Sequence, residues 1–468
     1  MKASIIGGAL ICCAAALGTQ NAAAEAKNII FFLGDGMGPV TQTAARIYAG
    51  EKLGLEVPES HKLAMEQLPY AARIKTYSED AQTTDSAPGM ASYMTGMKSK
   101  NEVISMTPDT NPNDANGNPY QTNGDSTCPA SGNGERAQTL LEILKARGYG
   151  TGVVSTTRIT HATPATTYAH ICNRNAENTI AAQMVPGGEG YNGELGDDGI
   201  DVILGGGRRH FLPTTDGGRR TDGRDLLVEM QDAGYTYVST GSELAGVNLA
   251  GTDKLFGIFN SSDLNYELDR VNGDLNEPSL ADMTGAAIDI LSRNQDGYFL
   301  MVEGGRIDHA LHGTNAKRAL EDTLAFDEAI ATAVSKVNLD DTLIVVTADH
   351  DHVMAFNGYS KIGNPVLGLL KEYRGGELAL DAQGKPFTTL VFGNGGGPRE
   401  ANRATLTESE VLEDDYLQEV GVRLGGPGSE THGGGDIRLT AGGAGSERFK
   451  GTLDNIEVFG LIEDAMGL

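Results

Sequence analysis

Apolar runs of strand length alternate with helix-like segments along most of this chain, and this alternation limits the folds open to it. The apolar runs lie at Asn28–Leu33, 152–155, 200–204, 298–302 and 342–346. Apolar residues with helical spacing lie between them, at 136–147, 279–293 and 315–336. Runs that are apolar throughout are typical of strands buried on both faces. We therefore predict an α/β fold, a three-layer sandwich with a mainly parallel central sheet flanked by helices.

The character of the sequence changes over 353–431, where glycine is frequent and a short strand-like run lies at 388–392. We predict that 353–431 forms a cap, or surface insertion, on the main body of the protein. The candidate ligands described below extend from Asp35 to His432. A single catalytic domain, 25–468, therefore has to contain nearly the whole mature chain.

The first 24 residues have the pattern of a secretory signal peptide. Lys2 precedes an apolar run at 5–17, and three small residues end at Ala24. The run is too short to span a membrane, and the polar end of the chain at 462–468 carries no hydrophobic anchor signal. We expect cleavage after Ala24 and export of a soluble protein to the periplasm or the extracellular space.

Export would leave two cysteines, Cys128 and Cys172. A lone pair in an oxidising compartment usually forms a disulfide, and two separate buried thiols are the alternative. A bridge would also stiffen the segment that carries Arg174.

The net charge of −27 disfavours two classes of partner. Nucleic acid and anionic membranes would both be repelled at long range, so we expect neither a nucleic-acid-binding module nor a membrane anchor. If the substrate is a small anion, local positive charge has to overcome this field.

Three short segments are crowded with potential metal ligands, at 302–312, 347–352 and 430–433. They hold five of the nine histidines of the chain. Carboxylates and imidazoles together suit divalent cations, above all zinc and magnesium. One such segment would be read as a solvated strand end, but three in one chain favour a metalloenzyme. Asp308 and His312 are four residues apart, so on a helix they share a face and can bind one ion.

The segment from Thr84 to Ser92 looks like the start of a helix, with Pro88 in its first turn. The oxygen of Ser86 would then lie near the positive end of the helix dipole, which favours an alkoxide and an incoming phosphate. The alternative is that Ser86 only caps the helix.

Taken together, these segments resemble the alkaline phosphatase family over nearly the whole mature chain. The resemblance also rests on 34–38, on the run from His161 to Pro164 and on 170–174. It implies a phosphate-monoester hydrolase with a phosphoserine intermediate on Ser86, two zinc ions and one magnesium ion. It also implies a homodimer, for which 353–431 is the expected interface.

The resemblance assigns a role to each candidate site residue. The ligands of the first zinc are Asp308, His312 and His432. The ligands of the second zinc are Asp35, Ser86, Asp349 and His350. The ligands of magnesium are Asp35, Thr163 and Glu303. Arg174 would bind two oxygens of the phosphate.

Three further histidines are expected to act beside the ligands. His161 and His309 stand where some members of the family carry Asp and Lys, and they would tune magnesium and phosphate without binding a metal. His352 would orient a ligand carboxylate, and its alternative is a solvated histidine at a strand end. Some members bind calcium beside a Phe-Glu pair, where this chain has Phe259 and Asn260.

Three other functions compete with that of a monoesterase. A sulfatase of the same superfamily needs an arginine shortly after its nucleophile, and 87–90 contains none. Phosphodiesterases commonly lack the magnesium ligands and the arginine, so Thr163, Glu303 and Arg174 favour a monoesterase. A non-catalytic phosphate- or metal-binding protein is the alternative from a different class.

Overall fold

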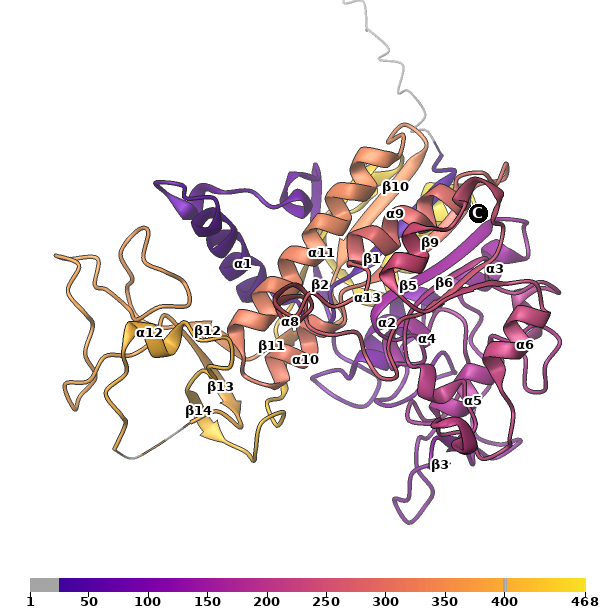
Figure 1. Cartoon of the computed structure of the whole chain (residues 1–468), viewed down its shortest axis with the longest axis horizontal. Helices are drawn as coiled ribbons and strands as arrows, with labels where there is room; N and C mark the ends of the chain where they lie inside the picture. Colours follow the sequence, from indigo (N-terminus) through magenta and orange to yellow (C-terminus); the bar gives the residue numbers. More distant parts are fainter. Residues whose placement is uncertain (1–24, 399, 401) are drawn as a thin grey trace, which may run out of the picture.

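A ten-stranded sheet forms the centre of the protein (Figure 1). The structure, a computed structural model, describes residues 25–398, 400 and 402–468. The order of the strands in the sheet is β17-β2-β16-β10-β1-β9-β5-β6-β8-β7. The strands are β1 (Asn28–Leu33), β2 (Tyr70–Lys75), β5 (Gly150–Arg158), β6 (Val202–Gly206), β7 (Thr236–Val238), β8 (Leu255–Ile258), β9 (Tyr298–Glu303), β10 (Thr342–Thr347), β16 (Ile437–Gly443) and β17 (Gly451–Asp454).

The middle of the sheet is parallel, and β16 alone runs antiparallel to both of its neighbours. In β1, Leu33 pairs with Thr347 of β10 on one side and with Glu303 of β9 on the other. Every residue of β9 and β10 is buried, which explains why these runs are apolar throughout. The predicted α/β fold with a mainly parallel sheet is confirmed.

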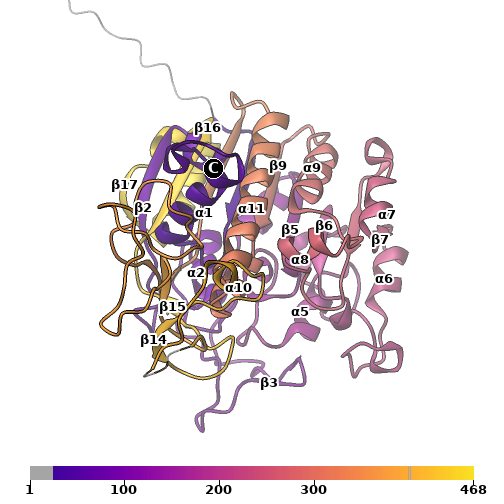
Figure 2. The same ribbon diagram turned by 60° about the vertical axis from the view of Figure 1, so that its left-hand side comes forward.

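Helices cover both faces of the sheet (Figures 1 and 2). One layer contains α1 (Pro39–Lys52), α8 (Glu267–Asn272), α9 (Leu280–Leu291), α10 (Arg306–His312) and α11 (Ala316–Lys336). The other contains α2 (Ser86–Thr95), α3 (Leu140–Lys145), α4 (Ala162–Ala165) and α13 (Asn455–Met466). The remaining elements of this part of the chain are β3 (Gln121–Thr122), β4 (Asp125–Ser126), α5 (Glu177–Gln183), α6 (Leu226–Asp232) and α7 (Gly241–Ala245). Of these, α5 packs against β4, and α6 packs against the edge strand β7.

Most element boundaries fall close to the predicted ones, and α3 differs most. The apolar spacing predicts a helix over 136–147, whereas α3 covers Leu140–Lys145. Thr139 caps this helix by accepting a hydrogen bond from the N–H of Glu142, and the Glu142 side chain bonds back to the Thr139 N–H. This capping box fixes the first turn of the helix after Thr139.

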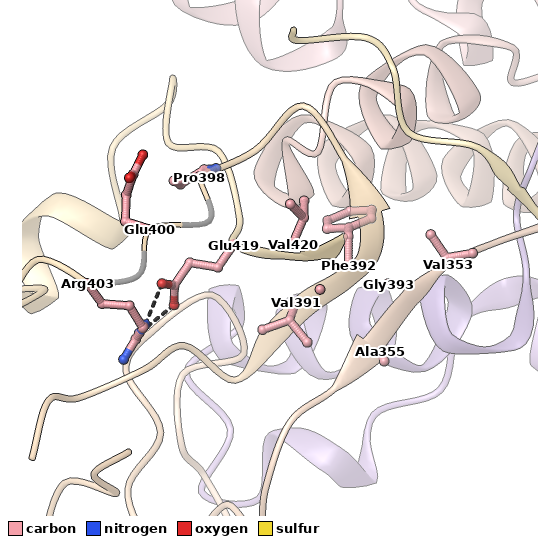
Figure 3. A pocket seen from close by; sticks show the side chains of 11 residues that line it. Val353, Ala355, Val391, Phe392, Gly393, Pro398, Glu400, Arg403, Glu419 and Val420 are labelled. Atoms are coloured by element: carbon pink, nitrogen blue, oxygen red, sulfur yellow. Dashed lines mark hydrogen bonds and ion pairs between the residues drawn. The ribbon is translucent and has the colours of Figure 1, made fainter. Parts of the chain in front are cut away.

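The segment 353–431 carries more regular structure than its single predicted strand. It forms a three-stranded sheet of β12 (Met354–Phe356), β13 (Leu390–Gly395) and β14 (Val420–Arg423), with α12 (Glu408–Val411) beside it. Apolar residues of this sheet line a cavity of about 420 Å³, at whose edge Arg403 and Glu419 form an ion pair (Figure 3). The division into a 25–468 domain with a 353–431 cap stays a prediction, and the predicted signal peptide, 1–24, lies outside the described residues.

A two-stranded ladder joins the two ends of this segment. β11 (Asp351–His352) pairs antiparallel with β15 (His432–Gly433), so that His352 lies opposite His432. The chain therefore leaves the main body and returns to it at neighbouring positions, and both of these positions carry candidate site residues.

Cys128 and Cys172 form a disulfide, as one of the two alternatives predicted. The bridge spans a sequence separation of 44 residues and ends two residues before Arg174. It therefore ties the segment that carries Arg174 to the β3–β4 hairpin region.

Replacing Cys128 and Cys172 by serine should lower the free energy of unfolding by about 3–4 kcal/mol, because the open chain regains the entropy of a loop of this length. Urea unfolding followed by circular dichroism measures the change against the oxidised wild type. The reduced wild type is the control, and it should unfold at the same urea concentration as the double variant. An unchanged unfolding midpoint in the double variant would contradict a stabilising role for the bridge.

Candidate active site

The candidate ligands meet at the carboxyl ends of the central parallel strands, where open α/β sheets form their sites. Asp35 follows β1, Glu303 ends β9 and Asp349 follows β10. The three carboxylates are fully buried. The N–H of Gly36 donates to Oδ1 of Asp349 at 3.0 Å, which ties the loop after β1 to the loop after β10.

Ser86 is the first residue of α2, and Asp85 occupies the N-cap position. The alternative that Ser86 caps the helix is therefore wrong. Its Oγ lies 3.3 Å from Oδ1 of Asp35 and 3.2 Å from Nε2 of His350. The positive end of the α2 dipole favours negative charge at this oxygen.

A first group of ligand atoms comes from α10 and β15. Oδ1 of Asp308 lies 3.2 Å from Nε2 of His312 and 3.5 Å from Nε2 of His432. The two Nε2 atoms are 3.2 Å apart. Ligands of a tetrahedral zinc lie about 3.3 Å from one another, so this triangle has the size of a zinc site with one position left open.

A second group of the same size surrounds Ser86. Nε2 of His350 lies 3.2 Å from Oδ1 of Asp35 and 3.5 Å from Oδ2 of Asp349. The rings of His350 and His432 stack at a centroid distance of 3.5 Å, so the second group lies directly beside the first.

A third group, made of oxygen atoms, lies on the other side of Asp35. Oδ2 of Asp35 accepts a hydrogen bond from Oγ1 of Thr163 at 3.3 Å. Oε2 of Glu303 accepts hydrogen bonds from Ser155 and, at 3.0 Å, from Thr157. Oxygen ligands of this kind suit magnesium.

Two buried carboxylate oxygens, Oε1 of Glu303 and Oδ2 of Asp349, have no hydrogen-bond partner among the described residues. Burial and the neighbouring Asp35 carboxylate raise the pKa of both acids well above the usual range. Unpartnered buried carboxylates are costly, and a divalent cation would remove both the repulsion and the missing partner. The residues present therefore fit metal ions at these groups.

Arg174 lies at the mouth of the site between Asp85 and His161. Its Nη1 pairs with Oδ1 of Asp85, and its Nη2 donates to Nε2 of His161 at 2.9 Å. Burial, with the charges of Arg158 and Arg174, lowers the pKa of His161 to about 3. His161 is therefore neutral, and its proton lies on Nδ1.

His309 faces His161, with their ring centroids 5.4 Å apart. Nη1 of Arg306 donates to Nδ1 of His309 at 2.7 Å, so the other ring nitrogen carries the proton. Burial lowers the pKa of His309 as well. A ring nitrogen of His161 also lies within 4.8 Å of oxygens of Asp35 and Glu303. The predicted roles of His161 and His309 stay predictions.

His352 is held between two carboxylates, 2.8 Å from Oδ1 of Asp308 and 2.6 Å from Oε2 of Glu430. Burial alone would lower the pKa of His352, but these two hydrogen bonds raise it. The residue is 2% exposed, which rules out the alternative of a solvated strand-end histidine. Both ring nitrogens of His352 are thus engaged by carboxylates, and its predicted role, to orient Asp308, stays a prediction.

Sequence reasoning assigned no role to several residues that shape the site. They are Asp85, Ser155, Thr157 and Glu430. Glu430 holds His352 and also accepts, at its backbone oxygen, from Nδ1 of His312 at 2.5 Å. Glu430 lies in one of the three ligand-rich segments, and this position was the feature of the sequence that could have pointed to its role. Nδ2 of Asn260 donates to Oε1 of Glu277 at 2.6 Å.

A model of the alkaline phosphatase family matches residues 26–468. The chain belongs to the alkaline phosphatase family. It is 37% identical over 473 residues to the membrane-bound alkaline phosphatase of Bombyx mori, covering 94% of this chain and 80% of that protein. It is also 37% identical over 441 residues to the tissue-nonspecific isozyme of Gallus gallus, covering 89% and 80%. The Thermus thermophilus alkaline phosphatase structure superposes with a TM-score of 0.67 at 27% identity, covering 98% of this chain and 96% of that one.

Membership in the alkaline phosphatase family makes this chain a phosphomonoesterase that works with metal ions. The family match extends over the groups of ligand atoms, Ser86 and Arg174 alike. The resemblance stated from the sequence motifs is thus confirmed for family and activity.

Replacing Asp85 by asparagine should raise KM for an aryl phosphate and Ki for inorganic phosphate roughly ten-fold, with a smaller effect on kcat. Asparagine can still accept the hydrogen bond from the N–H of Glu102, but it loses the charge that holds Arg174 in place. Asp80→Asn is the matched control, since Asp80 accepts from a backbone N–H nearby without contacting Arg174. Equal KM values in both variants would argue against this role of Asp85.

Proposed function

We propose that this alkaline phosphatase hydrolyses phosphate monoesters through a phosphoserine intermediate on Ser86, with two zinc ions and one magnesium ion. The observation that carries the proposal is the position of Ser86. Its Oγ lies at the start of α2 and within 3.3 Å of both Asp35 and His350. This position makes Oγ of Ser86 both a candidate ligand atom and a candidate nucleophile.

The nature of the ligand atoms supports the choice of metals. The first group, Asp308, His312 and His432, and the second, Asp35, Ser86, Asp349 and His350, contain imidazoles and suit zinc. The third group, Asp35, Thr163 and Glu303, contains oxygens alone and suits magnesium. When bound, such ions supply the positive charge that attracts phosphate and stabilises the attacking and leaving oxygens.

The residues of the chain provide the rest of the reaction. Ser86 Oγ bonds to phosphorus in line with the ester bond that breaks, and the leaving alkoxide takes a proton from water. Arg174 presents a planar pair of N–H groups to two oxygens of the phosphoryl group. Water then attacks the phosphoserine, which releases phosphate and restores Ser86.

Replacing Ser86 by alanine should lower kcat for an aryl phosphate by at least about a thousand-fold, because the nucleophile is lost. Removing metal with a chelator should abolish turnover and phosphate binding in the wild type. Ser92→Ala is the matched control, since Ser92 is buried on the same helix and only bonds to the carbonyl of Pro88. Mass spectrometry after an acid quench should find a phosphoryl group on Ser86.

Activity that survives both chelation and Ser86→Ala would refute the mechanism. The same assay is repeated with a bis-aryl phosphate and with an aryl sulfate as substrates. Diester turnover that equals or exceeds monoester turnover would refute the monoesterase in favour of a phosphodiesterase.

Dimerisation through 353–431 is a second part of the proposal. Exposed apolar side chains gather there, and those of Tyr359, Ile362 and Leu380 are 82%, 63% and 57% exposed. The N–H of Gly363 donates to Glu59 at 2.8 Å, which places this region beside the short turn at Pro58–Ser60. An exposed apolar face of this kind is typical of a protein interface.

The wild type should elute from gel filtration as a dimer, and a Tyr359→Glu, Ile362→Glu double variant should elute as a monomer. Two buried charges without partners are incompatible with a packed interface. Val228→Glu is the control, because Val228 is 49% exposed on α6, outside this face. A monomeric wild type would refute the dimer.

Export to an oxidising compartment is the third part, and the Cys128–Cys172 disulfide supports it. The described part of the chain has no helix with the length and apolar character of a membrane span.

A further inference from the structure

Two pairs of adjacent arginines, Arg208-Arg209 and Arg219-Arg220, lie close together in a chain with a net charge of −27. The fold brings them together, since the N–H of Arg219 donates to the carbonyl of Arg209 at 2.7 Å. Arg220 is neutralised by Asp222. No carboxylate of the described chain lies within ion-pair distance of Arg209 or Arg219.

Arg219 lines a cavity of about 740 Å³. Most of the other side chains that line it are neutral hydrogen-bonding groups, among them Gln121, Asn123, Asn175, His210 and Thr214. Arg209 lies directly behind this wall, where its Nε donates to His210 at 3.2 Å. Neutral donors around unpaired guanidinium groups are the chemistry that binds a phosphate.

The acidic residue that lines the cavity, Glu177, does not cancel this charge. Arg158 binds Oε2 of Glu177 at 2.8 Å. Burial alone would raise the pKa of Glu177, but Arg158 and His210 lower it to about 2. Burial, and then the charges of Arg209 and Arg158, lower the pKa of His210 to about 4, against an opposing effect of Glu177. Arg158 also binds Asp263 at 2.8 Å, and Arg306 lies 3.9 Å from the same carboxylate, so these two arginines balance Glu177 and Asp263. The positive charges of Arg209 and Arg219 therefore remain.

The cavity adjoins the reaction site. Asn175, in its lining, is the residue after Arg174. Glu177 accepts a hydrogen bond from Thr160, the residue before His161, at 2.7 Å.

We propose that this cavity binds a second phosphate group, carried by the leaving group of the substrate, so that the enzyme prefers bisphosphorylated compounds. The inference rests on the proposed monoesterase function. The second phosphate stays intact while it is bound. Its charge interacts with Arg219 and Arg209 while the first phosphate is transferred to Ser86.

The test compares α,ω-alkanediol bisphosphates of increasing chain length with alkyl monophosphates of the same length. For the wild type we expect kcat/KM to favour the bisphosphate about five- to twenty-fold at one spacer length. In Arg219→Gln this ratio should fall close to one, while kcat/KM for the monophosphates stays unchanged. Arg147→Gln is the control, because it removes the same charge from an exposed position before the amino end of β5, whereas Arg158 at the carboxyl end of this strand binds Glu177 of the cavity.

A bisphosphate preference that persists in Arg219→Gln, or no preference at any spacer length, would overturn this inference alone. Adding free methylphosphonate to the monophosphate assay tests whether the cavity binds a phosphate that is linked to the substrate or an anion that binds independently of it. If it changes monophosphate turnover through Arg219 while the bisphosphates show no advantage, the cavity is a separate anion site and the inference fails. A wild type that hydrolyses no alkyl monophosphate would overturn the monoesterase function and this inference with it.

Discussion

Repulsion among buried carboxylates at the carboxyl ends of the central strands is the constraint on which the rest of the site depends. β1, β9 and β10 are neighbours and parallel, so Asp35, Glu303 and Asp349 have to meet where these strands end. A few neutral groups donate hydrogen bonds to these carboxylates, as Ser155 and Thr157 do to Glu303. These donors leave one oxygen of Glu303 and one of Asp349 unpartnered within the described structure. Fold and cation binding are thereby linked, because the sheet that gives the protein its core also creates a negative charge that the core cannot balance.

A related constraint acts on α2. Asp85 stands at the N-cap of this helix, but its carboxylate is turned toward Arg174 and the N–H of Glu102. The helix therefore starts without a hydrogen bond from the side chain of its N-cap residue, which leaves N–H groups of its first turn available to an anion. The disulfide ends two residues before Arg174 and restrains the backbone on the other side of this pair. Ser86 and Arg174 are thus positioned by segments that are far apart in sequence, since the Asp85–Arg174 pair alone spans 89 residues.

Local patterns in the sequence predicted the features that depend on local physics. Apolar runs identified the buried parallel strands, and the spacing of Asp308 and His312 placed both on one face of α10. Contacts between distant segments were not accessible in this way. The hydrogen bond between His352 and Glu430 spans 78 residues, and no periodicity encodes it. The three-stranded sheet of 353–431 was also missed, because its strands are short and pair across long irregular stretches.

The ladder of β11 and β15 has a consequence for how such enzymes diversify. It fixes His352 and His432 opposite each other with two residue pairs, whatever lies between them in the chain. The entropy of closing a longer loop grows only slowly with its length, so insertions or deletions between these two strands cost little as long as the ladder forms. The segment between them can therefore change in size and surface from one descendant to the next while the position of His432 stays constant. Such an arrangement lets access to the site and self-association evolve separately from the chemistry.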